Sequence, residues 1–332
     1  MTAPTFDVVA LGSAIVDVLA TAHDADLEAR GLVKGTMALV DAARADELYA
    51  AMGPAVEVSG GSAANTVAGV ASFGGSAAFM GKIRDDQLGA VFAHDIRAVG
   101  VAYQTAPAAS GPATARCLVF VTPDAQRTMT TYLGAATGLG PDDVDTAVVA
   151  AARYTYLEGY LWDPPEAISA LRLAISAATG AGRQVALSLS DPFCVDRHRK
   201  DFLELIDDHV DVLFANEVEI MSLFEASSLP GALDALRSRG RCRLAAVTLG
   251  PLGSVIVTPD ATLECPATPV EHVVDTTGAG DLYAAGFLYG LATGAGLLRC
   301  GRLGSLAAAE VISHVGARPL EPLASLVPRD AG

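Results

Sequence analysis

The segment DTTGAGD, Asp275 to Asp281, is the part of the chain best suited to chemistry on a phosphate group. Its glycines let the backbone approach a ligand closely, and the apolar run that follows predicts a helix. Because free N–H groups at a helix start bind anions, we expect a phosphate on the amides of Ala279, Gly280 and Asp281. The carboxylate of Asp281 beside that phosphate would be a general base for an attacking hydroxyl. The alternative is a glycine-rich turn in which Asp281 only caps the helix.

Two segments in the first half offer further ligand contacts. GGSAAN, residues 60–65, places two glycines, the second of them Gly61, before an expected helix whose first turns include Asn65. The Asn65 amide can hydrogen-bond ligand hydroxyls, although small residues here also suit close helix packing. Arg127 stands beside an expected β-hairpin. Because a guanidinium matches phosphate oxygens, Arg127 is a candidate phosphate clamp, with a solvated hairpin end as the alternative.

Two strand ends in the second half carry candidate nucleotide contacts. Asn216 and Glu219 follow the apolar strand VLFA in the pattern N-x-x-E. A carboxylate at that place can hold Mg²⁺ through water, whereas the alternative role is a helix cap. Thr248 and Gly250 end the next expected strand, where a glycine lets a nucleotide approach and a simple β-turn is the alternative.

The elements that position these residues alternate between strands and helices from about residue 140 onward. Strands separated by helices imply a mostly parallel sheet covered on both faces, with ligands outside the carboxyl ends of the strands. A β-hairpin at residues 115–121 and 128–133 interrupts the alternation. The expected strands are 6–11, 154–157, 185–189, 210–214, 245–249 and 254–257, and the clearer helices are 85–99, 165–178, 217–225, 281–291 and 297–314.

Composition narrows the classes of function. The chain has 332 residues and a formal net charge of −16, and an acidic surface repels the phosphate backbones of nucleic acids. No window has the ~18 continuous apolar residues of a membrane span, and the first residues lack the regions of a signal peptide. Five cysteines without a C-x-x-C pair suit reduced thiols, so we expect a cytoplasmic protein. The absence of G-x-G-x-x-G after the first strand argues against a dinucleotide-dependent oxidoreductase.

Together, these segments resemble the PfkB or ribokinase-like kinase family in order and spacing, over nearly the whole chain. The resemblance implies an α/β fold: a mostly parallel sheet covered by helices on both faces, with a small β-sheet lid that closes over the substrate. The large nucleotide-binding domain would comprise residues 1–13, 42–98 and 135–332, and the lid residues 14–41 and 99–134. The resemblance also implies ATP as phosphate donor, Mg²⁺, activation by K⁺, and a monomer or a homodimer joined through the lid.

The resemblance assigns roles to residues already singled out. Asp281 matches the catalytic base of the family, and Gly278, Ala279 and Gly280 match its anion hole. The other matched positions bind the nucleotide or cations: Asn216 and Glu219 organise Mg²⁺ and the phosphates, Thr248 and Gly250 contact the nucleotide, and Asp275 and Thr277 help to bind a monovalent cation.

For the acceptor, four segments resemble the adenosine kinase branch of this family, one of them the aromatic-rich YLEGYLW, Tyr156 to Trp162. VALSLSDPFC ends near Pro-Phe as in adenosine kinases, and Phe193 there can stack on a purine, with a core aromatic as the alternative. RTMTTYLGAAT and GSAIVDVLA are also similar to adenosine kinase segments, and in the second one Asp17 matches the residue that binds the ribose hydroxyls. The resemblance makes Met37, Leu39 and Leu133 the apolar walls of the base slot, and Gly61 and Asn65 further ribose contacts.

The sequence therefore predicts an ATP-dependent kinase that transfers the γ-phosphate to the 5′-hydroxyl of a purine nucleoside, adenosine first. A sugar or sugar-acid kinase of the ribokinase or 2-keto-3-deoxygluconate kinase type is the near alternative, from which Phe193 and the apolar lid residues distinguish it. An inactive nucleotide- or nucleoside-binding sensor is the alternative from another class, against which the intact Asp281 and N-x-x-E motif argue. Two departures stand out: Arg84, where relatives usually have glycine, would favour an anionic acceptor, and Leu282-Tyr283 replace the usual pair after GAGD.

Overall fold

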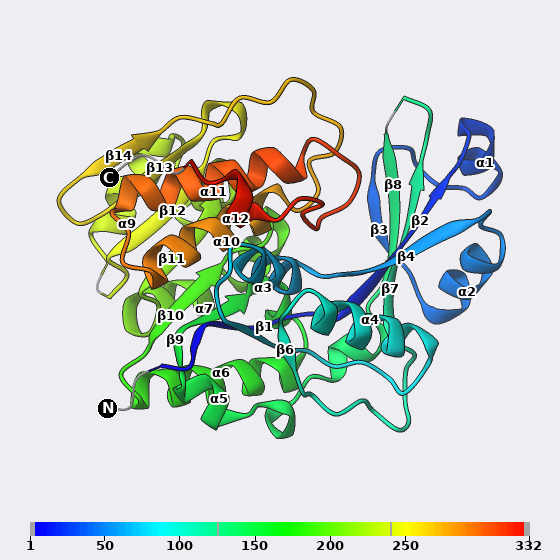
Figure 1. Ribbon diagram of the computed structural model, residues 1–332, viewed down its shortest axis with the longest axis horizontal. Helices are drawn as coiled ribbons and strands as arrows, with labels where there is room; N and C mark the ends of the chain where they lie inside the picture. Colours follow the sequence, from blue (N-terminus) through cyan, green and yellow to red (C-terminus); the bar gives the residue numbers. More distant parts are fainter. Residues whose placement is uncertain (1–3, 125, 240, 329–332) are drawn as a thin grey trace.

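Two β-sheets organise the protein, one of nine strands and one of five (Figure 1). The computed structural model describes residues 4–124, 126–239 and 241–328. The large sheet has the strand order β14-β13-β12-β11-β10-β9-β1-β5-β6, and the small sheet, on the right in Figure 1, has the order β3-β8-β7-β2-β4. Among the described residues, none of the helices combines the length and hydropathy that crossing a bilayer needs.

The large sheet is parallel from β6 to β12, and only β13 and β14 run antiparallel to their neighbours. This confirms the mostly parallel sheet that alternating strands and helices predict. β13 reverses direction because the short 3-10 turn η4 (Gly250–Leu252) joins it to β12, whereas a parallel pair needs a long crossover. The strands are β1 (Phe6–Leu11), β5 (Ala77–Met80), β6 (Ala102–Tyr103), β9 (Ala152–Glu158), β10 (Gln184–Ser188), β11 (Val212–Asn216), β12 (Leu244–Thr248), β13 (Ser254–Val257) and β14 (Thr262–Cys265).

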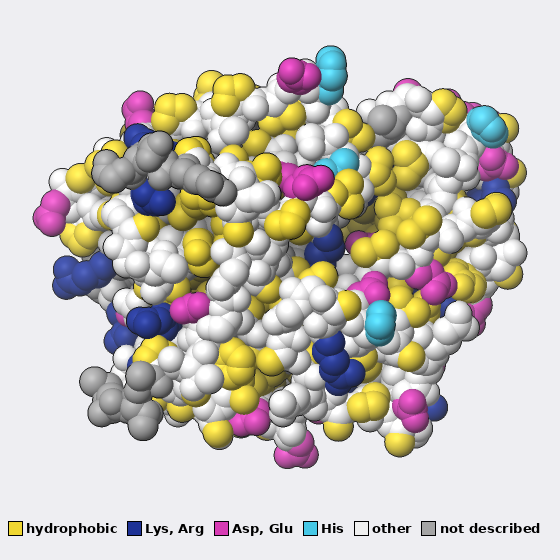
Figure 2. Space-filling view, viewed as in Figure 1, with side chains coloured by type: hydrophobic (Ala, Val, Ile, Leu, Met, Phe, Trp, Pro, Cys, Tyr) yellow, Lys and Arg dark blue, Asp and Glu magenta, His cyan; other side chains and the backbone are white. Residues whose placement is uncertain are grey.

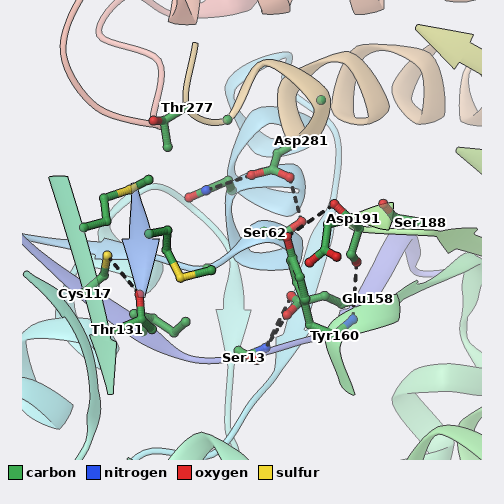
Figure 3. A pocket seen from close by; sticks show the side chains of 18 of the residues that line it. Ser13, Ser62, Cys117, Thr131, Glu158, Tyr160, Ser188, Asp191, Thr277 and Asp281 are labelled. Atoms are coloured by element: carbon green, nitrogen blue, oxygen red, sulfur yellow. Dashed lines mark hydrogen bonds between the residues drawn. The ribbon is translucent and has the colours of Figure 1, made fainter. Parts of the chain in front are cut away.

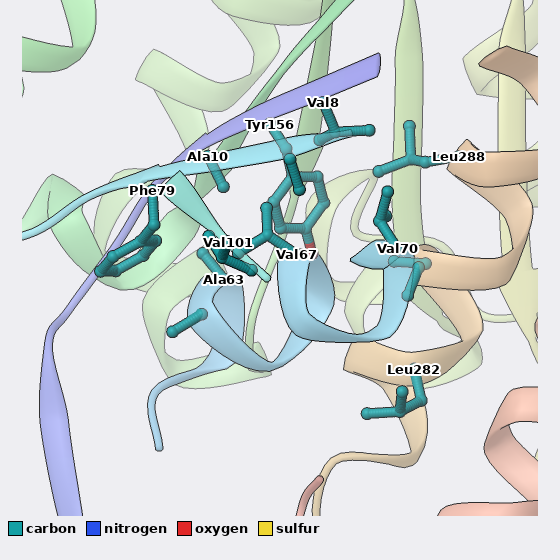
Figure 4. Packing of buried hydrophobic residues seen from close by; sticks show 14 of the residues in the cluster. Val8, Ala10, Ala63, Val67, Val70, Phe79, Val101, Tyr156, Leu282 and Leu288 are labelled. Atoms are coloured by element: carbon teal, nitrogen blue, oxygen red, sulfur yellow. The ribbon is translucent and has the colours of Figure 1, made fainter. Parts of the chain in front are cut away.

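Helices cover both faces of the large sheet, and β1 shows why. Its residues from Val8 to Leu11 are all apolar, as in strands buried on both sides. Val8 and Ala10 belong to one hydrophobic core, shown in Figure 4, whereas Val9 and Leu11 belong to the other. The first core lies under α3 (Ser62–Ser72), α4 (Gln87–Ala98), α10 (Ala279–Ala292), α11 (Leu297–Val311) and α12 (Leu323–Leu326), and the second under α5 (Thr146–Ala150), α6 (Pro165–Gly180), α7 (Pro192–Asp208), α8 (Glu217–Leu223) and α9 (Leu229–Arg237).

The small sheet is built around the predicted hairpin. Strands β7 (Ala115–Val121) and β8 (Arg127–Tyr132) pair antiparallel, and β2 (Ile15–Thr21) adds to β7 in parallel. The outer strands are β3 (Met37–Leu39) and β4 (Ala55–Gly60), and the connections hold α1 (Asp24–Ala29) and α2 (Ala42–Ala50). Because β4 ends directly before α3, the chain passes from the small sheet into the large part of the molecule at Gly61.

The predicted domain ranges assign two strands to the wrong sheet. β4, within the range 42–98 assigned to the large domain, pairs with β2 in the small sheet. β6, within the range 99–134 assigned to the lid, pairs with β5 in the large sheet. β6 has only two residues and β4 is exposed at its first two, so tertiary pairing rather than local pattern decides their sheet. The end residues 1–3 and 329–332 of the predicted large domain, and residue 240, lie outside the described residues.

Candidate active site

A cavity of about 690 Å³ lies between the two sheets, at the carboxyl ends of β9 to β12. The face seen in Figure 2 is hollowed between the large part and the small sheet, and hydrophobic side chains gather on the small-sheet side of the hollow. Of the site residues predicted from the sequence, all but Gly250, Ala279 and Asp275 line this cavity. Residues from eight separate segments of the chain therefore meet at one place.

The carboxylate of Asp281 is held by two side chains of α3. Ser62 Oγ donates to Asp281 Oδ1 at 2.6 Å, and Asn65 Nδ2 donates to Oδ2 at 3.0 Å (Figure 3). Helices α3 and α10 can pack this closely because residue 69 of α3 is a glycine, and a Cβ on Gly69 would collide with α10. Burial raises the pKa of Asp281, while the hydrogen bonds from Ser62 and Asn65 and the charge of Arg318 lower it. The predicted base thus has a fixed orientation, with one donor, Ser62, that we did not anticipate.

The glycine turn before Asp281 has the geometry of an anion site. Gly278 caps α10 in the left-handed region, with φ of 79°, and a Cβ there would lie 2.8 Å from Ala317. Gly280 and Asp281 occupy the second and third positions of the helix, whose N–H groups have no partner within a helix. The N–H of Ala279 instead donates to Thr276 O at 3.2 Å. Of the three backbone N–H groups predicted to bind phosphate, that of Ala279 is therefore already hydrogen-bonded within the turn.

Arg127 forms an ion pair with Asp275. Its Nη2 lies 2.7 Å from Asp275 Oδ2, and its Nη1 donates to Thr277 Oγ1 at 3.2 Å. Asp275 also accepts the N–H of Thr277 at Oδ1 and the N–H of Gly316 at Oδ2, each at 3.0 Å. The predicted phosphate clamp and the predicted cation-binding pair are therefore in contact, and they join the small sheet to the loop before α10.

Asn216 and Glu219 form a capping box at the start of α8. Glu219 N–H donates to Asn216 Oδ1 at 2.9 Å, and Asn216 donates through its backbone to Glu219 Oε2 at 2.9 Å and through Nδ2 to Oε1 at 2.6 Å. The helix cap, posed as the alternative to cation binding, is thus present, and both residues also line the cavity. Burial raises the pKa of Glu219 to about 7, and the charges of Asp191 and Asp281 add to the increase. Thr248 lies beside Asn216 in the strand register.

The small sheet provides the opposite wall. Asp17 of β2 stands in register with Cys117 of β7, which in turn faces Thr131 of β8. Burial raises the pKa of Asp17 to about 6, against the lowering effect of Arg318 and Arg127. Met37 and Leu39 of β3 line the cavity although 52% and 62% of their surface is exposed. The wall is therefore apolar at its outer edge and carries one carboxyl group further in.

Phe193 lies at the mouth of the cavity, on the first turn of α7, and is 75% exposed. That exposure excludes the alternative of a core aromatic. Arg84 is placed differently from our expectation: its Nη1 donates to Gly111 O, and it is not among the cavity residues. The predicted cation at the substrate end is therefore wrong. Of the pair after GAGD, Leu282 is buried in the core and Tyr283 hydrogen-bonds Ser254 Oγ at 2.7 Å.

Residues 24–323 match the model of the pfkB family carbohydrate kinases. The chain belongs to the PfkB family. It is 30% identical to the adenosine kinase of Saccharomyces cerevisiae, over 95% of this chain and 96% of that protein. Two solved structures each superpose with a TM-score of 0.90 and cover 97% of this chain and 98% of theirs: the adenosine kinase from Sinorhizobium meliloti, 53% identical, and a probable sugar kinase protein from Rhizobium etli CFN 42, 48% identical.

Membership in the PfkB family confirms the ribokinase-like fold and the resemblance to its adenosine kinase-like branch. The protein is accordingly a kinase, a phosphotransferase with a hydroxyl group as acceptor, and the family implies use of ATP.

Besides Ser62, two polar cavity residues, Glu158 and Tyr160, were given no role from the sequence. Glu158, at the end of β9, is 1% exposed and accepts the N–H of Ala63 at 3.0 Å. It also accepts the N–H of Ser13 at 3.4 Å (Figure 3). Burial raises its pKa to about 7. Tyr160 also lines the cavity, and so does Asp191, which was expected at the carboxyl end of a strand. Glu158 is the last residue of the apolar strand β9 and Tyr160 lies two residues further on, a position that could have identified both.

Proposed function

We propose that this PfkB kinase transfers the γ-phosphate of ATP to the 5′-hydroxyl of a purine nucleoside, adenosine first. The exposed ring of Phe193, in the same cavity as the exposed side chains of Met37 and Leu39, supports this acceptor most directly. A planar base placed between them would cover apolar surface on both sides. The 53% identity to the adenosine kinase from Sinorhizobium meliloti over nearly the whole chain supports the same acceptor.

In this proposal Asp281 is the general base. Ser62 and Asn65 each occupy one carboxylate oxygen, and the remaining lone pairs are available to the acceptor hydroxyl. Because both donors are present before substrate binds, the carboxylate is already oriented for proton removal. The N–H groups of Gly280 and Asp281 would stabilise the oxygens of the phosphoryl group as it moves to the hydroxyl.

The donor set at the end of β11 fits a magnesium ion. Glu219 and Asn216 offer hard oxygen ligands at the cavity wall, and they would hold Mg²⁺ through water. When bound, Mg²⁺ neutralises charge on the phosphates. Thr248 and Gly250 would contact the nucleotide beside them. Asp275 and Thr277 remain candidates for a monovalent cation such as K⁺, although here the guanidinium of Arg127 occupies the same side chains.

The small sheet is proposed to act as a lid over the acceptor. Asp17 would bind the ribose hydroxyls, with Gly61 and Asn65 opposite, while Leu133 would extend the apolar wall. Closure of such a sheet would exclude water from the reacting phosphate and limit ATP hydrolysis.

The decisive experiment measures ADP release with Mg-ATP against adenosine, guanosine, inosine, cytidine, ribose, fructose and 2-keto-3-deoxygluconate. We expect turnover confined to purine nucleosides, and its loss by a factor of about 10²–10⁴ in Asp281→Asn. Asp142→Asn, an exposed aspartate in the turn before α5, is the matched control and should keep full activity. Turnover of sugars alone would overturn the nucleoside proposal, and an active Asp281→Asn would overturn the assignment of the base.

A sugar acceptor is the second candidate, and Glu158 favours it. This buried carboxyl group lies on the cavity floor among polar groups and could accept hydrogen bonds from the hydroxyls of a bare sugar. The probable sugar kinase protein from Rhizobium etli, 48% identical, is consistent with this alternative. Ribose and fructose in the same panel separate the two candidates.

A further inference from the structure

The segment Gly316-Ala317-Arg318, in the loop between α11 and α12, touches three parts of the site from behind. The N–H of Gly316 donates to Asp275 Oδ2 at 3.0 Å. Ala317 packs against Gly278 and fills the space that a Cβ on Gly278 would need. Arg318 Nε donates to Asn65 Oδ1 at 2.8 Å. A short stretch near the end of the described chain therefore supports the glycine turn and the residues around the base.

We propose that Arg318 is a positioning residue for Asp281 and acts through Asn65, an inference that rests on Asp281 being the base. An asparagine amide can present either its oxygen or its nitrogen to a neighbour. Arg318 has only donors, so the amide oxygen of Asn65 must face it and the amide nitrogen must face Asp281. The reversed amide would place an oxygen against the carboxylate and would lose both hydrogen bonds.

The charge of Arg318 acts in the same direction. Burial favours the neutral form of Asp281, which cannot accept a proton, and the guanidinium opposes that effect. Among the described residues, the charged groups that interact with these two include four carboxyl groups from four elements: Asp17 of β2, Asp95 of α4, Glu158 of β9 and Glu219 of α8. The other cation nearby, Arg127 of β8, interacts with Asp17. With several carboxyl groups so close, Arg318 helps to keep Asp281 ionised.

A packing role alone does not explain an arginine at this position. Nη1 and Nη2 of Arg318 are both buried, and neither has a hydrogen-bond partner among the described residues. Burying a guanidinium with two unpaired nitrogens costs stability that a methionine of similar length would not cost. Arg318 is also not among the residues lining the cavity, so its effect on the reaction must pass through Asn65 and through its charge.

The test compares Arg318→Met and Arg318→Lys, with Arg302→Met on the exposed face of α11 as the control. The acceptor is whichever compound in the panel gives the highest turnover. We expect kcat of Arg318→Met to fall on the order of 10- to 100-fold, because small displacements of a catalytic group cost up to about 10²-fold. KM should change little, and the acidic limb of the pH–rate profile should move to higher pH. Arg318→Lys should restore the position of that limb, since it returns the charge, and only part of kcat.

A double-mutant cycle separates action through Asn65 from a general structural role. In an Asn65→Ala background the effect of Arg318→Met on kcat should be smaller by about threefold or more, as for residues in contact. Independent, multiplying effects, or an unshifted pH limb in Arg318→Met, would overturn the proposal. If Arg318→Met does not fold, Arg318→Lys is the deciding variant. A pH–rate profile like that of wild type together with a reduced kcat supports the proposal, whereas a wild-type kcat contradicts it. An active Asp281→Asn would instead show that the base itself is wrongly assigned.

Discussion

Arg127 of the small sheet and Asp275 of the loop before α10 are joined by an ion pair of 2.7 Å that connects the two walls of the cavity. Both side chains are largely buried, with 10% and 4% of their surface exposed. If Arg127 binds the phosphate as we propose, it must exchange the carboxylate of Asp275 for the phosphate during the reaction. In that proposal the pair would link the position of the small sheet to the occupancy of the phosphate site.

Removing one partner of this pair should be worse than removing both. Arg127→Met leaves the buried Asp275 without its cation, and we expect the free energy of unfolding in urea to fall by about 3 kcal/mol. Adding Asp275→Asn should recover part of that loss, because no charge then remains unpaired. kcat should fall about 10²–10³-fold in Arg127→Met, as when a donor to a transferring group is lost. Equal destabilisation by the single and double variants would contradict this account of the pair.

The sequence predicted six of the nine strands of the large sheet, β1 and β9 to β13, because their signals are local, and it did not predict β5, β6 or β14. Buried parallel strands such as β1 are continuous apolar runs, and the residues that end them are polar where ligands bind. The sequence did not predict the sheet of β4 or β6, because β4 is exposed at its first two residues and β6 has only two, and such strands are assigned by their partners rather than by their own pattern. Domain ranges drawn along the chain failed at those two strands for that reason.

The candidate site was predictable where a motif combines glycine with a carboxylate, and unpredictable where contacts depend on distant segments. Asp281 and Asn65 could be singled out from GAGD and GGSAAN. The bond from Arg318 to Asn65 joins residues 253 positions apart and leaves no local pattern. Arg84 shows the reverse error, since a departure in the sequence was given a functional role that the position of its side chain does not support.

Phe193 should determine the preference for a base. In Phe193→Ala we expect the KM for adenosine to rise about 5- to 100-fold, since stacking on an aromatic ring is worth about 1–3 kcal/mol per base. Any slow turnover of ribose should be unchanged, because a bare sugar does not reach the ring. Val218→Ala, another exposed apolar residue near the start of a helix, is the control and should have no effect. Equal losses with adenosine and ribose would mean that Phe193 supports the cavity rather than the base.

Glu158 should make stability depend on pH. Its pKa of about 7 in the folded protein lies above the ordinary value of 4.5, so the folded state binds the extra proton. The stabilisation from the neutral form is present below about pH 4.5 and is lost as the pH rises through about 7. Glu158→Gln keeps an oxygen that can accept the N–H groups of Ala63 and Ser13, but it cannot ionise. The variant should therefore not lose the free energy of unfolding, on the order of 3 kcal/mol, that wild type loses as Glu158 ionises.

Urea denaturation of wild type and Glu158→Gln at about pH 5 and about pH 8 measures that difference. The variant should lose less stability between the two conditions than wild type does. Part of the slope should remain, because Glu219 and Asp17 also have raised pKa values of about 7 and about 6. Identical slopes in the two proteins would mean that Glu158 is charged in the folded state.

Gly280 and Gly278 should respond in opposite ways to the same substitution. A Cβ on Gly280 would meet nothing within 4 Å, and its backbone is helical, so Gly280→Ala should stabilise the protein by about 0.5–1 kcal/mol. A methyl group at that position would nevertheless stand where we place the phosphate, so kcat/KM for ATP should fall at least about tenfold. Gly278→Ala should instead destabilise the fold, because φ is 79° and Ala317 lies 2.8 Å from the added carbon. A fully active, stabilised Gly280→Ala would show that the phosphate does not rest on this turn, since the structure offers no other reason for a glycine there.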